Sequence, residues 1–136
     1  MSGVILLGMT AQAALLVALG GAAGAVTRYA LSLWIVSLLS RSAWAAFPFA
    51  TLLINVSGSF VLAFLLTAIG RGVLPPELRL PLGVGFLGAY TTFSTFSVEL
   101  DGLLLRGEWG RVALYLLGNV GLGMGAALAG RLLALR

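Results

Sequence analysis

The chain has 136 residues, of which 60% are hydrophobic and only 9% are charged, and its formal net charge is +4. Soluble domains carry about 25% charged residues, so this composition excludes an ordinary water-soluble domain and indicates an integral membrane protein. Cysteine and histidine are absent and all eight basic residues are arginine, which excludes disulfides, thiol chemistry and the usual zinc sites. We expect no enzymatic activity, because no nucleophile–base pair suggests itself. We expect no nucleic-acid partner either, because the arginines are scattered singly and form no basic patch.

Four stretches of the chain are long and apolar enough to cross a membrane, which takes about 20 residues each. They cover residues 12–39, 47–69, 78–105 and 109–133. Residues 1–27 carry no charge, whereas a signal peptide has a basic start, so we interpret this beginning as part of the first span. The connections are short, which predicts antiparallel neighbours. We therefore expect an all-α integral membrane protein whose single four-span domain covers residues 1–136.

The first span contains Arg28, the one arginine that lies well inside a predicted span. A charge at a helix centre costs about 2.5–3.5 kcal/mol on insertion scales, so Arg28 is expected to face water, a partner or a vestibule, or else to snorkel to the interface. The first span also carries Gly20 and Gly24, and the fourth carries Gly121 and Gly125. Glycines spaced by four allow close helix approach, either within one chain or at a dimer interface.

Polar side chains recur every four residues on two of the spans. Thr51, Asn55 and Ser59 share one face of the second span, and Tyr115 and Asn119 share one face of the fourth. An unpaired amide is costly in lipid, so both asparagines should point into the bundle. A hydrogen bond between helices would account for one asparagine. Two polar tracks beside a hydroxyl-rich third span instead favour a path through the membrane that polar side chains line.

The third span contains the sequence GFLGAYTTFSTFS at residues 85–97. Hydroxyl side chains compete for backbone hydrogen bonds and glycine weakens a helix, so we expect the third helix to be broken mid-membrane. Broken backbone at that depth is tolerated only where protein buries it or where it lines a wet cavity. Phe93 and Phe96 share a helical face, and the positive edges of their rings can contact a small anion without holding it strongly.

The arginines are nearly balanced between the two sides of a four-span protein. The side that holds both termini carries Arg71, Arg79, Arg131 and Arg136. The opposite side carries Arg41, Arg106 and Arg111. The positive-inside rule therefore selects no orientation. Either another feature sets the orientation or the chain inserts both ways, which would permit an antiparallel dimer with a two-fold axis in the membrane plane.

Three sequence blocks occur together in an order and at a spacing that are specific. They are residues 21–29 (GAAGAVTRY), residues 51–60 (TLLINVSGSF), and residues 85–96 (GFLGAYTTFSTF) followed by Glu99. Across essentially the whole chain they resemble the Fluc (CrcB) family of fluoride channels. The resemblance implies a dual-topology antiparallel homodimer with two pores in the cell (plasma or inner) membrane. It also implies passive export of fluoride from the cytoplasm, which lowers fluoride toxicity.

The resemblance implies roles for particular residues. Phe93 and Phe96 resemble the pair whose ring edges line the fluoride pathway, and Asn55 resembles the asparagine that donates a hydrogen bond to the ion. The other implied pathway residues are Thr51, Ser94, Thr95, Tyr115 and Asn119. Arg28 is implied at the vestibule and Glu99 near a pore mouth. The backbone carbonyls of Gly88 and Thr91, from both subunits, are implied to hold a structural sodium ion at the dimer axis.

One departure and two rival interpretations remain. The family often carries hydroxyls further along the fourth span, where this chain has Gly121, Gly123 and Gly125, so the polar track is either shorter or completed by backbone and water. A small proton-coupled multidrug exporter would need a membrane-embedded carboxylate, and the first two spans contain none. A non-transporting membrane subunit would use its polar residues for packing only, and would not need the break.

Overall fold

The structure is a computed structural model that describes residues 10–136, and this part of the chain is helical apart from its connections. Two long helices come first, α1 (Ala11–Leu39) and α2 (Phe49–Gly70). The remaining elements are η1 (Pro76–Arg79), η2 (Leu80–Leu87), α3 (Gly88–Tyr90), α4 (Phe93–Leu105), α5 (Trp109–Leu117), η3 (Gly118–Leu122) and α6 (Gly123–Ala134). The interpretation of residues 1–9 as part of the first span lies outside the described residues.

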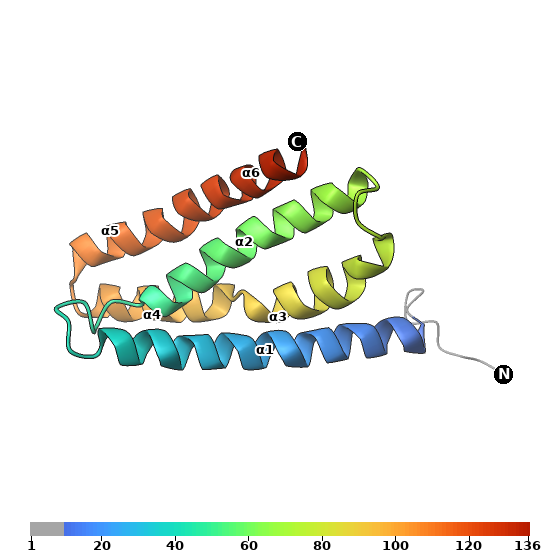
Figure 1. Ribbon diagram of the computed structural model, residues 1–136. Coiled ribbons are helices and arrows are strands. Elements are labelled where there is room, and N and C mark those ends of the chain that lie inside the picture. The colour runs from blue at the N-terminus through green and yellow to red at the C-terminus, as the bar shows by residue number, and fades with distance from the viewer. Residues whose placement is uncertain (1–9) are drawn as a thin grey trace.

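The elements lie alongside one another, as Figure 1 shows. α1 packs mainly against η2 and α3, and α2 packs mainly against α6. The start of α1, the connection from α2 to η1 and the end of α6 lie at one end of the molecule (Figure 1). The connections at residues 40–48 and 106–108 lie at the other end, so consecutive long segments run in opposite directions.

The outer surface of the protein is apolar. Within residues 10–136, three helical stretches are long and apolar enough to cross a membrane: Ala11–Leu39, Phe49–Gly70 and Trp109–Ala134. Only Gly24 and Ile35 are buried among the 29 residues of α1. A helix that exposes this much apolar surface is stable when lipid, rather than water, surrounds it. The prediction of an all-α membrane protein is thereby confirmed.

Glycines bring the backbones of α1 and η2 into direct contact. A Cβ atom added at Gly24 would overlap the carbonyl oxygen of Phe86, and one added at Gly20 would overlap the carbonyl oxygen of Pro81. This first pair of glycines therefore serves packing within one chain. By contrast, a Cβ atom at Gly121 or Gly125 would meet no protein atom within 4 Å among the described residues.

The ends of the long segments are held by local polar contacts. At the end of α2 the side chain of Arg71 donates from Nη1 to the carbonyl oxygen of Ala134 at 2.7 Å, which ties α2 to the end of α6. In the connection before α5, Glu108 accepts from Arg106 and Arg111. The hydrogen bond from Arg106 lowers the pKa of the Glu108 carboxyl, so this acid stays charged at neutral pH.

Helical geometry changes along the last two long segments. The helical backbone stops at Tyr90, and Thr91 (φ −80°, ψ 156°) and Thr92 (φ −151°, ψ 117°) are extended before α4 begins. We call Thr91 and Thr92 the interruption. The preceding η2 is π-helical, and η3 is a second π-helical segment between α5 and α6. π-helical turns of this kind are frequent at functional sites.

Candidate functional site

The interruption is held by a side-chain amide from α2. The backbone N–H of Thr92 donates to Oδ1 of Asn55 at 2.9 Å, and Nδ2 of Asn55 donates to the carbonyl oxygen of Thr92 at 3.1 Å. The same Nδ2 donates to Oδ1 of Asn119 in η3 at 3.0 Å. The two asparagines expected to point into the bundle therefore hydrogen-bond to each other and to the interruption.

The interruption frees two backbone carbonyls from helical bonding. In an α-helix the N–H of residue 92 would donate to the carbonyl of Gly88, and that of residue 95 to the carbonyl of Thr91. Here the Thr92 N–H donates to Asn55, and the Thr95 N–H donates to the hydroxyl of Thr92 at 3.2 Å, which caps the start of α4. The carbonyls of Gly88 and Thr91 thus lose their helical partners.

Arg28 reaches from α1 to the short α3, directly before the interruption. Its Nε donates to the carbonyl oxygen of Ala89 at 3.1 Å, and the side chain is half-buried. Ala89 lies in the short α3, at the end of a helical stretch, where free carbonyls carry partial negative charge. Arg28 is therefore placed beside the interruption, where it neutralises one of those carbonyls, rather than at an end of α1.

A cavity of about 260 Å³ lies beside the interruption. We call it the amide cavity because Asn55 and Asn119 both line it. Its other lining residues are Gly58, Ser59, Leu62, Thr91, Thr92, Phe93, Phe96 and Val120. The first turn of α4 borders this cavity, and the N-terminus of a helix carries partial positive charge. The arrangement suits a small anion.

The two phenylalanine rings at the amide cavity lie in different surroundings. Their centroids are 5.7 Å apart, but Phe96 is 6% exposed whereas Phe93 is 79% exposed. Phe96 contacts Tyr115, with ring centroids 5.2 Å apart. The two rings are therefore neighbours, as their expected shared face predicts. However, only Phe96 is buried within this chain.

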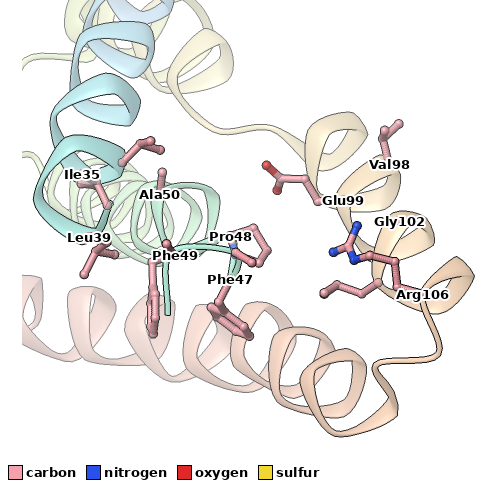
Figure 2. Close-up of a pocket in the computed structure, with 14 residues that line it drawn as sticks. Ile35, Leu39, Phe47, Pro48, Phe49, Ala50, Val98, Glu99, Gly102 and Arg106 are labelled. Carbon is pink, nitrogen blue, oxygen red and sulfur yellow. The ribbon is translucent and has the colours of Figure 1, made fainter. Parts of the chain in front are cut away.

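A second cavity, of about 380 Å³, contains Glu99 and Arg106 among its lining residues. Figure 2 shows Glu99 on α4 and Arg106 directly after the end of α4, with both side chains extending toward the segment that carries Pro48. We call it the Glu99 cavity. The hydroxyl of Tyr115, a fully buried residue, donates to Oε2 of Glu99 at 2.5 Å. Phe96 and Tyr115 thus lie between the amide cavity and the Glu99 cavity.

The remaining residues singled out from the sequence are spread around these cavities. Thr51 is buried in α2 and lines neither cavity. Ser94 is exposed, and Thr95 accepts a hydrogen bond from the Thr92 hydroxyl at 3.0 Å. Sequence reasoning assigned no site role to Thr92, although a threonine three residues before Thr95 at the start of a helix is a recognisable cap.

The fold and the site define a class of protein: a helical membrane protein with a small polar cavity beside an interrupted helix. Residues 15–131 match the family described as CrcB-like protein, Camphor Resistance (CrcB). The chain is 56% identical over 119 residues to a Fluoride-specific ion channel FluC of Deinococcus radiodurans, which covers 88% of this chain and 92% of that protein. It is 45% identical over 116 residues to a protein of the same name from Thermus thermophilus, covering 85% and 88% of the two chains. This chain belongs to the CrcB-like family.

Proposed function

We propose that this protein is a fluoride-selective channel that lets fluoride leave the cytoplasm by passive conduction across the cell (plasma or inner) membrane, and so lowers fluoride toxicity. The observation that carries the proposal is the 56% identity, over 88% of the chain, to a relative named Fluoride-specific ion channel FluC. The chemistry of the amide cavity supports it. Family membership gives no support to an exporter of organic cations or to a non-transporting subunit.

Fluoride is small and strongly hydrated, so a pore has to replace its water shell with hydrogen-bond donors and positive ring edges. Conduction also requires binding that is weak and shared among several sites. The amide cavity offers amides, hydroxyls and the rings of Phe93 and Phe96, and none of the described residues that line it is charged. Thr51, Asn55, Ser94, Thr95, Tyr115 and Asn119 complete the proposed pathway. Arg28 and Glu99 stand at its vestibule and mouth.

The exposure of Phe93 supports an assembly of two copies. At 79% exposed, its ring leaves the amide cavity open at the protein surface. We propose that the chain crosses the membrane four times and that its third crossing is broken at the interruption. We also propose that it pairs with an antiparallel second copy, and that the pair encloses two equivalent pores. The nearly balanced arginines support insertion in both orientations.

The carbonyls of Gly88 and Thr91 are candidate ligands for a structural sodium ion on the dimer axis. Both have lost their helical N–H partners, as described above. Unwound backbone carbonyls are typical sodium ligands in membrane proteins, so the donor set fits this ion. When bound, sodium would supply a fixed positive charge that offsets the facing carbonyl dipoles of the two copies. It would not be transported.

Purified protein in liposomes tests the proposal directly. Vesicles loaded with fluoride and with chloride should release fluoride down its gradient, followed with a fluoride electrode, and retain chloride. Fluoride release no faster than from protein-free vesicles would refute the channel. Proton-driven uptake of an organic cation would then indicate the exporter, and no transport at all would indicate the non-transporting subunit.

A further inference from the structure

The Glu99 cavity has an apolar wall that carries two opposite charges. Residues of α1, of the connection between α1 and α2, of the start of α2 and of α4 line it. Among the described lining residues, Glu99 and Arg106 are charged and all the others are glycine or apolar. Low-dielectric walls concentrate the field of a charge inside a cleft. An ion that enters this cavity is therefore acted on mainly by these two side chains.

Glu99 on its own makes the cavity unfavourable for an anion. The hydroxyl of Tyr115 donates to Oε2 of Glu99 at 2.5 Å, so the side chain acts as a hydrogen-bond acceptor, as a carboxylate does. Phe96 and Tyr115 lie between this cavity and the amide cavity. On the proposed pathway, an anion that moves between the amide cavity and the water at this end of the protein passes the carboxylate, which repels it.

The guanidinium of Arg106 lies over the same wall. Residues 99, 102 and 106 share one helical face, and Arg106 follows directly after the end of α4. A Cβ atom added at Gly102 would lie 3.5 Å from Nη1 of Arg106. The guanidinium therefore folds back over Gly102, one helical turn closer to Glu99 than its own backbone is. Its side chain is 54% exposed, so it acts at the open mouth of the cavity.

An ion pair holds Arg106 in this position. Nε of Arg106 donates to Oε1 of Glu108, and Nη1 of Arg111 donates to Oε2 of the same carboxylate at 2.7 Å. Among residues 10–136 the ion pair of Arg106 is with Glu108 and not with Glu99. Two guanidinium groups share one carboxylate here, so the group keeps a net positive charge beside the cavity.

We propose that Arg106 draws fluoride into the Glu99 cavity and offsets the repulsion of Glu99, and so sets how often an anion enters the pathway from this end. The inference rests on the proposed function and adds an entrance residue to it. Arg28, by contrast, lines neither cavity and donates to the carbonyl of Ala89. A charge at the mouth of a cavity raises the local concentration of the opposite ion, and added salt screens this effect.

Salt dependence separates a charge at the entrance from a structural role. Liposomes are loaded with about 10 mM potassium fluoride, where the Debye length is about 30 Å, or with the same fluoride in about 1 M potassium glutamate, where it is about 3 Å. Potassium is equal on both sides and a potassium ionophore is present. We expect Arg106→Gln to slow fluoride efflux at least about threefold at low ionic strength, and to come within about 1.5-fold of the unmodified protein at high ionic strength.

Two further variants are the controls. Arg106→Lys keeps the positive charge and should conduct within about 1.5-fold of the unmodified protein at both ionic strengths. Arg41 is exposed in the connection between α1 and α2, at the same end of the molecule, but does not line the cavity. Arg41→Gln therefore removes the same charge from the same side of the membrane, so that any effect on the orientation of insertion is shared. It should also conduct within about 1.5-fold at both ionic strengths.

Any other pattern overturns the inference. Unchanged efflux of Arg106→Gln at low ionic strength would show that the charge attracts no anion, and equal slowing at both ionic strengths would mean a structural role. Slow efflux of Arg106→Lys would mean that the shape of the guanidinium matters rather than its charge. Equal slowing in Arg41→Gln would mean a general effect of surface charge or orientation. If the unmodified protein passes no fluoride at either ionic strength, the proposed function fails instead, which keeps the two results distinct.

Discussion

Asn55 supplies Thr92 with a hydrogen-bond acceptor and a donor at the point where the helix of residues 80–90 ends. In lipid no bulk water replaces such partners, so a backbone group that loses them keeps its full desolvation cost. Asn119 and Arg28 act at the same place, the first through Asn55 and the second through the carbonyl of Ala89. At the scale of residues, the site is a set of side chains that hydrogen-bond to backbone groups left without helical partners.

We predict that Asn55→Ala lowers the stability of the protein and slows fluoride efflux. It leaves the N–H of Thr92 without its partner, which costs about 1–3 kcal/mol. Asn55→Asp keeps an acceptor for that N–H and should recover much of the lost melting temperature, while efflux stays slow because a carboxylate in the amide cavity repels an anion. Thermal unfolding in detergent and liposome efflux measure both effects. If Asn55→Ala melted at the same temperature as the unmodified protein, the hydrogen bonds between Asn55 and Thr92 would contribute no stability.

We predict that Phe93→Ile slows fluoride efflux at least about tenfold without loss of folding. The ring is 79% exposed, so the chain's own core does not depend on it, whereas isoleucine has no positive ring edge to offer an anion. Leu105→Ala, at an exposed position on the same helix and outside both cavities, is the control. Normal efflux in Phe93→Ile would remove this ring from the pathway.

At the scale of elements, close contact between α1 and η2 brings Arg28 to the interruption. Gly20 and Gly24 have no side chain between the two backbones, and Gly85 of η2 faces Gly20. A larger residue would push α1 outward and draw the guanidinium away from Ala89. The glycines of the first span therefore allow α1 and η2 to pack closely, and this close packing also places Arg28 at Ala89.

We predict that Gly24→Ala destabilises the protein by about 1–3 kcal/mol, as overpacking usually does. The added Cβ would overlap the carbonyl oxygen of Phe86, a backbone atom that cannot rotate away. Gly110→Ala is the matched control, because nothing lies within 4 Å of its Cβ position and alanine favours the helix. Thermal unfolding of both variants gives the comparison, and equal melting temperatures would mean that α1 and η2 can separate at little cost.

At the scale of the whole molecule, the amide cavity is open at the surface of the single chain. Phe93 lines it yet faces outward, and the apolar surface around it gives a second copy a place to pack. The near-equal arginines on the two sides leave the chain without a strong orientation signal. Both features support the antiparallel pair put forward above.

We predict that a single cysteine introduced by Ala43→Cys is labelled from both sides of the membrane. Ala43 is exposed in the connection between α1 and α2, and the chain has no cysteine of its own to compete. An impermeant thiol reagent should modify about half of the protein in sealed vesicles, and the remainder only after permeabilisation. Complete labelling from one side would refute dual topology.

Sequence reasoning predicted which way some side chains face, but not the hydrogen-bond partners of others. It placed Asn55 and Asn119 on inward faces, and the structure joins them, because helical periodicity and the cost of an unpaired amide act locally. It left open whether Arg28 faces water, a partner, a vestibule or the interface, and the structure gives it a partner, the carbonyl of Ala89, 61 residues away. Such pairings depend on distances between segments remote in the chain.

The sequence by itself determined that this is an all-α membrane protein, because 60% hydrophobic and 9% charged residues leave too little polar surface to face water. It also marked residues 85–97 as unfit for a plain helix in lipid, through hydroxyls and glycines that compete locally for the backbone. Only the tertiary structure decided which partners meet the freed backbone groups, as Asn55 does for Thr92 and Arg28 does for Ala89. That allocation is decided by packing, because each donor has few hydrogens and each contact takes one of them.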